Sequence, residues 1–144
     1  MGLDMYLEKR IYVGAYHDHR KVEGNISLTC NGKPIVINLK NVADISERVA
    51  YWRKATQIHN WFVHNVQNGE DNCDEYGVTY KDLMKLKDLC EEVIRTKDAS
   101  LLPPAEGFFF GSTEIDDAYF TDLQYTVDVL KSLDPNGDYS YWSS

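Results

Sequence analysis

The spacing of hydrophobic residues changes along this chain, and the changes divide it into segments. Near the N-terminus, apolar residues alternate with polar ones in three runs, at positions 3–16, 26–30 and 34–39. Alternation with a period of two is typical of strands that bury one face. Asn31-Gly32, between the second and third runs, is a strong signal for a two-residue hairpin turn. We therefore expect a three-stranded antiparallel sheet over residues 1–40.

From residue 41 onward the spacing is that of amphipathic helices. The longest pattern predicts a central helix over residues 41–68, with an inner face of Val42, Ile45, Val49, Trp52, Ala55, Phe62 and Val66. The pairs Asp44/Glu47, Thr79/Asp82 and Thr113/Asp116 have the spacing of helix N-terminal caps. Two further helices are expected over 79–97 and 113–134, followed by a loosely held tail, 135–144.

These segments predict an α+β fold in which the N-terminal three-stranded antiparallel sheet packs against three helices, the long central one buried. The length of 144 residues is that of a single domain, 1–144.

The chain is acidic, with 23 acidic and 15 basic residues and a net charge of −8. General nucleic-acid binding is disfavoured because contact with phosphates requires a basic surface. The three cysteines have no CxxC spacing, so neither a disulfide framework nor a zinc site is indicated. No apolar run is long enough to span a membrane and no signal peptide is recognisable, so a cytoplasmic protein without membrane contact is expected.

Polar residues in the predicted central helix form the first candidate site. Their spacing places four of them on one row, with two more beside it: Arg53, Gln57, Asn60 and His64, then Lys54 and His59. Guanidinium, amide and imidazole groups suit a small anionic or nucleotide-like ligand. The alternative interpretation is a solvated helix face, with His59 a core imidazole bonded to a backbone carbonyl.

A second candidate site lies at Gly111, Ser112 and Thr113, before the predicted third helix. A helix N-terminus offers free N–H groups to an anion, and glycine permits close approach. The alternative is that Phe108–Phe110 form a core strand. The two candidate segments would enclose one ligand if they meet in space.

Catalytic and metal-binding motifs are not recognisable. We expect no cofactor, no metal and no catalytic residue, which favours a non-enzyme. His17 and His19 are two potential metal ligands without a third, and they leave a metal-dependent hydrolase as a weaker alternative. The series Asp134, Asn136, Asp138 fails as a calcium loop because Tyr139 stands where glycine is needed. The acidic loop 70–75 is interpreted as solvated.

Three separated motifs carry a resemblance that covers most of the chain: GLDMYL, then YWRKATQIHNWF, then EGFFFGST with the DLQYT segment. Together they resemble a family of small proteins of tailed phages and prophages that has no established activity. Thr56 departs from the family pattern, which has Asn there. The resemblance implies a phage accessory protein acting on host machinery or as an anti-defence factor.

The leading functional hypothesis is therefore a non-enzymatic phage-type protein that binds a small anionic or nucleotide-like ligand. The alternative is an acidic inhibitor of a host protein, which would bind through the acidic, Tyr-rich C-terminal half. The sequence leaves open the identity of the ligand, the host partner and the oligomeric state, with a homo-oligomer among the options.

Overall fold

The computed structural model describes residues 2–14, 26–105 and 115–144. Its fold is α+β, with an antiparallel sheet of four strands in the order β4-β1-β6-β5. The strands are β1 (Asp4–Tyr12), β4 (Asp44–Arg53), β5 (Tyr76–Val78) and β6 (Asp138–Ser143). The α-helices are α1 (Thr56–Asn65), α2 (Tyr80–Thr96) and α3 (Asp117–Leu130). The α+β prediction is confirmed.

The core lies between one face of the sheet and the three helices. Side chains at alternate positions of the strands point into it, and Met5 and Leu7 on β1 have no exposed surface. Helix α1 reaches β6 through Phe62, whose ring is stacked on that of Tyr141 with centroids 3.8 Å apart. Helix α3 reaches β4 through Thr126, whose hydroxyl accepts a 2.9 Å hydrogen bond from the Trp52 indole. The opposite face of the sheet, here called the open face, carries partly exposed side chains such as Tyr6, Glu8 and Trp142.

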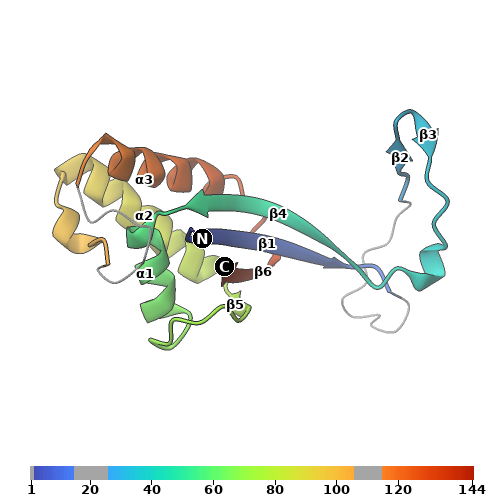
Figure 1. The fold of residues 1–144 in the computed structure, drawn as a ribbon, viewed down its shortest axis with the longest axis horizontal. Coiled ribbons are helices and arrows are strands. Elements are labelled where there is room, and N and C mark those ends of the chain that lie inside the picture. Colours follow the sequence, from blue (N-terminus) through green and yellow to red (C-terminus); the bar gives the residue numbers. More distant parts are fainter. Residues whose placement is uncertain (1, 15–25, 106–114) are drawn as a thin grey trace.

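An arm extends from this body (Figure 1). Strands β1 and β4 run together away from the helices and lead to a small hairpin, β2 (Thr29–Cys30) and β3 (Lys33–Pro34). The Asn31-Gly32 turn predicted from the sequence is confirmed, and both residues have positive φ, 52° and 77°. The predicted three-stranded N-terminal sheet is wrong because β2 and β3 pair only with each other, whereas β1 joins the four-stranded sheet.

The predicted central helix over 41–68 is also wrong. Its first half is strand β4, and the helix proper, α1, begins only at Thr56. Lys54 separates the two with a left-handed φ of 58°, which interrupts a helix. Strand formation follows from pairing with β1 along the whole of β4, including a β-bulge opposite Leu7 and Glu8. Asp44 is the first residue of the strand and not a helix cap.

The predictions for the second and third helices agree with the structure better than the prediction for the tail does. Helix α2 has the predicted Thr79 cap, whose side chain accepts a hydrogen bond from the backbone N–H of Asp82. Helix α3 is capped by Asp116, and the predicted Thr113 start lies outside the described residues. The tail is not loose, because residues 138–143 form β6 between β1 and β5. Its C-terminal residue exchanges two backbone hydrogen bonds with Asp4.

Candidate functional site

The predicted polar row does not exist as one surface. Arg53 ends strand β4, so it shares no helix with Gln57. The Gln57 side chain is buried and donates a 3.3 Å hydrogen bond to the carbonyl of Tyr119 on α3, which makes it part of the α1–α3 packing. Asn60 is half-buried, and His64 is exposed at the far end of α1. The structure therefore separates Arg53 and Lys54 from the predicted residues of α1.

Arg53 and Lys54 lie together at the end of β4. The Arg53 side chain is 65% exposed, and its Nε is 4.0 Å from the Asp4 carboxylate. A Cβ added to Gly2 would lie 3.7 Å from both Arg53 Nε and Lys54 Cε, so both cationic side chains flank the N-terminal segment. Two sets of predicted residues lie outside the described part of the chain: Gly111, Ser112 and Thr113, and the pair His17 and His19. That the 111–113 segment meets Arg53 in space therefore stays a prediction.

His59 is the predicted residue with the most developed surroundings. Its ring is fully buried, with Nδ1 2.6 Å from the Tyr141 hydroxyl and Nε2 2.8 Å from an Asp71 carboxylate oxygen. A carboxylate can only accept, so Nε2–H donates to Asp71, and Nδ1 accepts from the Tyr141 hydroxyl. The burial of His59 agrees with the alternative interpretation, a core imidazole, but its two ring nitrogens bind side chains of a loop and a strand rather than a backbone carbonyl.

Burial controls the protonation of this Tyr141–His59–Asp71 chain. It lowers the pKa of His59, against the opposing effect of Asp71, and raises the pKa of Tyr141 well above its ordinary value. Both rings have no exposed surface, so neither can reach a ligand from solvent. The arrangement therefore links α1, β6 and the 70–75 loop through buried hydrogen bonds.

The open face of the sheet carries an aromatic and charged cluster. The rings of Tyr6 and Trp142 are stacked with centroids 4.2 Å apart, and the Arg48 guanidinium lies 4.3 Å from the Tyr6 centroid. Glu8 accepts hydrogen bonds from the Trp142 indole, the Ser46 hydroxyl and Arg48. Burial raises the Glu8 pKa, but these hydrogen bonds outweigh it and hold the pKa below its ordinary value.

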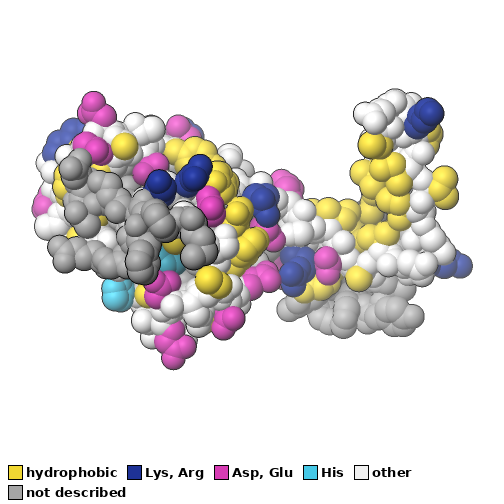
Figure 2. All heavy atoms as spheres, viewed as in Figure 1, with side chains coloured by type: hydrophobic (Ala, Val, Ile, Leu, Met, Phe, Trp, Pro, Cys, Tyr) yellow, Lys and Arg dark blue, Asp and Glu magenta, His cyan; other side chains and the backbone are white. Residues whose placement is uncertain are grey.

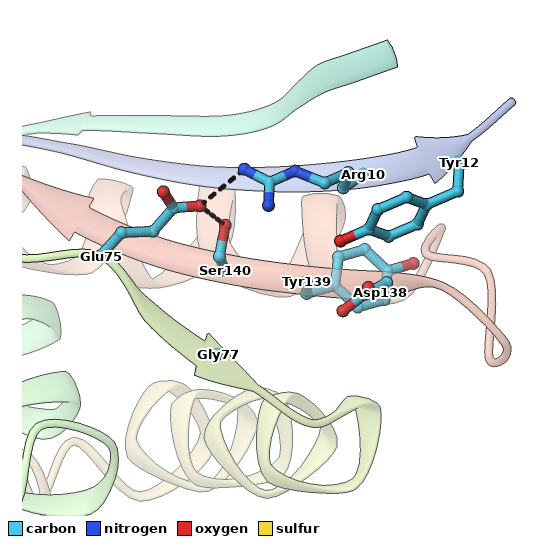
Figure 3. A pocket seen from close by; sticks show the side chains of 7 residues that line it. All are labelled: Arg10, Tyr12, Glu75, Gly77, Asp138, Tyr139 and Ser140. Carbon is cyan, nitrogen blue, oxygen red and sulfur yellow. Dashed lines mark hydrogen bonds and ion pairs between the residues drawn. The ribbon is translucent and has the colours of Figure 1, made fainter. Parts of the chain in front are cut away.

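A shallow hollow of about 330 Å³ continues this open face (Figure 3). Glu75 accepts hydrogen bonds from Ser140 at 2.6 Å and from Arg10 at 3.4 Å. Figure 3 shows the Tyr12 ring beside Asp138 at the other end. The hollow is lined by Arg10, Tyr12, Glu75, Gly77, Asp138, Tyr139 and Ser140. Its guanidinium already pairs with a carboxylate inside the chain, so it is poorly suited to an added anion.

A second hollow, of about 340 Å³, lies beside the first part of β4 and the loop after α3. Lys9 crosses it to form a 3.4 Å ion pair with Asp134. Among the described residues, no group of three His, Cys, Asp or Glu side chains is placed to hold a metal ion. Within the same residues, no helix has the length and apolar character needed to cross a membrane.

The feature that the sequence interpretation missed is the apolar surface of the arm. Residues 26–43 are here called the apolar arm. Four of their aliphatic side chains are solvent-exposed: Leu28 by 46%, Ile35 by 47%, Val36 by 98% and Ile37 by 38%. Figure 2 shows hydrophobic side chains gathered on the arm, away from the body. The signal of this surface in the sequence is the run Ile35-Val36-Ile37, which fits a strand of the predicted N-terminal sheet equally well.

Comparison of this chain with models of known protein families, with curated proteins and with solved structures gives no match. Its function is therefore argued from its own geometry.

Proposed function

We propose that this chain is a non-enzymatic protein-binding protein that contacts its partner through the apolar arm. The observation that carries the proposal is the exposure of Leu28, Ile35, Val36 and Ile37 on a projecting arm. Contiguous exposed apolar surface of this kind marks interaction sites in soluble proteins. A host protein as the partner, and a phage-type anti-defence role, are the parts of the proposal that rest on the sequence resemblance.

The energetics favour a partner that covers the arm. Fully burying a valine, leucine or isoleucine side chain that starts fully exposed contributes roughly 1.5–3 kcal/mol. Val36 is 98% exposed and meets that condition, whereas Leu28, Ile35 and Ile37 are 38–47% exposed and contribute correspondingly less. The hairpin itself has two residues in each strand, and a two-stranded hairpin is marginally stable by itself. A partner would therefore stabilise the arm as well as cover it.

Charge gives the chemistry of the complementary surface. In an acidic chain, residues 26–43 contain Lys33 and Lys40 and no acidic residue. A matching surface on the partner would be apolar at its centre and acidic around it. The acidic C-terminal half suggested by the sequence would instead select a basic partner. The two versions differ in the sign of the charge that the partner must carry.

Pull-down of proteins from host lysate, identified by mass spectrometry, tests this proposal with three baits: wild type, Val36→Asp and Leu101→Asp. Leu101 is a matched control, because it is 44% exposed but lies on the body. We expect one protein to be captured by wild type and Leu101→Asp and lost with Val36→Asp. Equal capture by all three baits would place the binding surface elsewhere. Capture of a basic protein by all three baits, weakened by salt, would favour the acidic half.

A small-ligand function is the second candidate, favoured by the adjacent Arg53 and Lys54. The Arg53 guanidinium is exposed, and the carboxylate beside it, that of Asp4, is 4.0 Å away. Native mass spectrometry of the freshly purified protein, repeated after denaturation, would detect a bound anionic compound. Arg53→Ala should abolish its retention, whereas Arg95→Ala, on the exposed face of α2, should not. Identical spectra for the two variants would reject this site.

A further inference from the structure

Strand β4 presents an exposed sheet edge. It is the terminal strand in the order β4-β1-β6-β5, and no described strand pairs with its outer side. Near its C-terminal end α3 occupies that side, because the Tyr125 hydroxyl accepts a 3.1 Å hydrogen bond from the backbone N–H of Tyr51. The first five residues of the strand, Asp44–Arg48, are all exposed. Soluble proteins usually block or pair such an edge.

The register of β4 shows which backbone groups face outward. The Ala43 carbonyl accepts from the N–H groups of Val13 and Gly14, so residue 43 points toward β1. In an antiparallel pair the hydrogen-bonding direction alternates from one residue to the next. Residues 45 and 47 therefore also point toward β1, opposite residues 11 and 9. It follows that Asp44, Ser46 and Arg48 direct their N–H and C=O groups to the open edge.

We infer that this edge pairs with the same edge of a second copy, antiparallel and centred on Ser46. The two-fold axis then places Asp44 of each copy opposite Arg48 of the other, and joins the two four-stranded sheets. The three outward residues of each strand would exchange about six backbone hydrogen bonds. The inference is independent of the apolar arm.

Charge selects this register over its neighbours. Opposite charges directly across an antiparallel pair stabilise it, and like charges destabilise it. A shift that centres the axis on residue 44 or 48 places two Asp44 or two Arg48 side chains opposite each other. Centring on residue 47 does the same with two Glu47 side chains. Centring on residue 45 shortens the overlap and leaves Asp44 without Arg48 opposite.

The test is sedimentation velocity over a range of protein concentrations, using Asp44→Arg, Arg48→Asp and their mixture. In a dimer of the Asp44→Arg variant alone, the introduced arginine would face Arg48 of the other copy. In a dimer of the Arg48→Asp variant alone, the introduced aspartate would face Asp44 of the other copy. We expect wild type to dimerise and each variant alone to dissociate at least roughly tenfold more readily. Their mixture should dimerise again, because both cross-pairs are then oppositely charged. Circular dichroism of each variant verifies that the body stays folded.

Asp74→Arg is the matched control, since it makes the same charge change at an exposed loop position away from β4. It should dimerise like wild type. A wild type that stays monomeric at high concentration would overturn the inference, as would a mixture that stays monomeric while both variants are folded. A dimer dissolved by Val36→Asp and unaffected by Asp44→Arg would also overturn it, because the contact would then be made by the apolar arm.

Discussion

Replacing Tyr141 by phenylalanine isolates the energetic contribution of the buried Tyr141–His59–Asp71 chain. The substitution removes the hydroxyl that lies 2.6 Å from His59 Nδ1 and keeps the ring that is stacked on Phe62. His59 has no exposed surface, so water does not replace the lost donor directly. A buried acceptor left without a partner costs about 1–3 kcal/mol. We expect the free energy of unfolding to fall by that amount.

Urea unfolding followed by tryptophan fluorescence at pH 7.5 gives the free energy, and a thermal melt gives a second reading. For a chain of this length, the expected loss corresponds to a fall in Tm of roughly 3–10 °C. Tyr6→Phe is the matched control, because Tyr6 lies on the open face of the sheet. If Tyr141→Phe changes stability by less than about 0.5 kcal/mol, or by no more than Tyr6→Phe, the hydrogen bond between Tyr141 and His59 contributes nothing beyond the packing of the ring.

Substitutions at three further positions are tested by urea unfolding. Burial lowers the His59 pKa below its ordinary value, so the unfolded state binds the proton more tightly; stability should therefore fall as the pH drops from about 8 to about 5.5, and His59→Gln should reduce that fall. Gly137→Ala should cost about 1–3 kcal/mol, because its Cβ would lie 2.6 Å from the buried Tyr139 ring. Thr79→Ala should cost about 0.5–2 kcal/mol through loss of the α2 cap, and Thr79→Ser should restore most of it.

Local signals in the sequence predicted the parts of the fold that depend on local chemistry. Asn31-Gly32 forms its turn because both residues accept positive φ. Thr79 caps α2 because its hydroxyl oxygen reaches the N–H of Asp82, three residues on. Leu123 and Leu130, seven residues apart on α3, lie on one helix face and are fully buried, as local helical spacing requires. Each of these features is decided within a few residues of the chain.

The errors arose where distant pairing decides the structure. Apolar residues at 42, 45, 49 and 52 fit a helix, and β1 makes most of that segment a strand by pairing with it from about 40 residues away. The segment 138–143 looked like a tail although Tyr139 and Tyr141 alternate with polar residues, which is a strand signal. His59 was recognised as unusual, yet its partners lie 12 and 82 positions away.

Contacts between distant residues also occupy several of the acidic side chains that give the protein its negative charge. The loop 70–75, interpreted from the sequence as solvated, is largely exposed, and two of its carboxylates also bind groups of the body: Asp71 accepts from His59, and Glu75 accepts from Arg10 and Ser140. Glu8 accepts from three donors on the open face. These acidic groups are already engaged within the fold, so a partner that bound them would first have to displace internal donors, at a cost in free energy.

The aliphatic side chains of the apolar arm impose no such cost. Val36 is 98% exposed, and covering it removes water from an apolar surface without breaking a hydrogen bond. Among the described residues of the body, the only buried side-chain polar atom without a hydrogen-bond partner is Gln67 Oε1, whereas the arm has apolar surface that gains from being covered. This difference is the physical reason for assigning recognition to residues 26–43 and a supporting role to the polar clusters of the body.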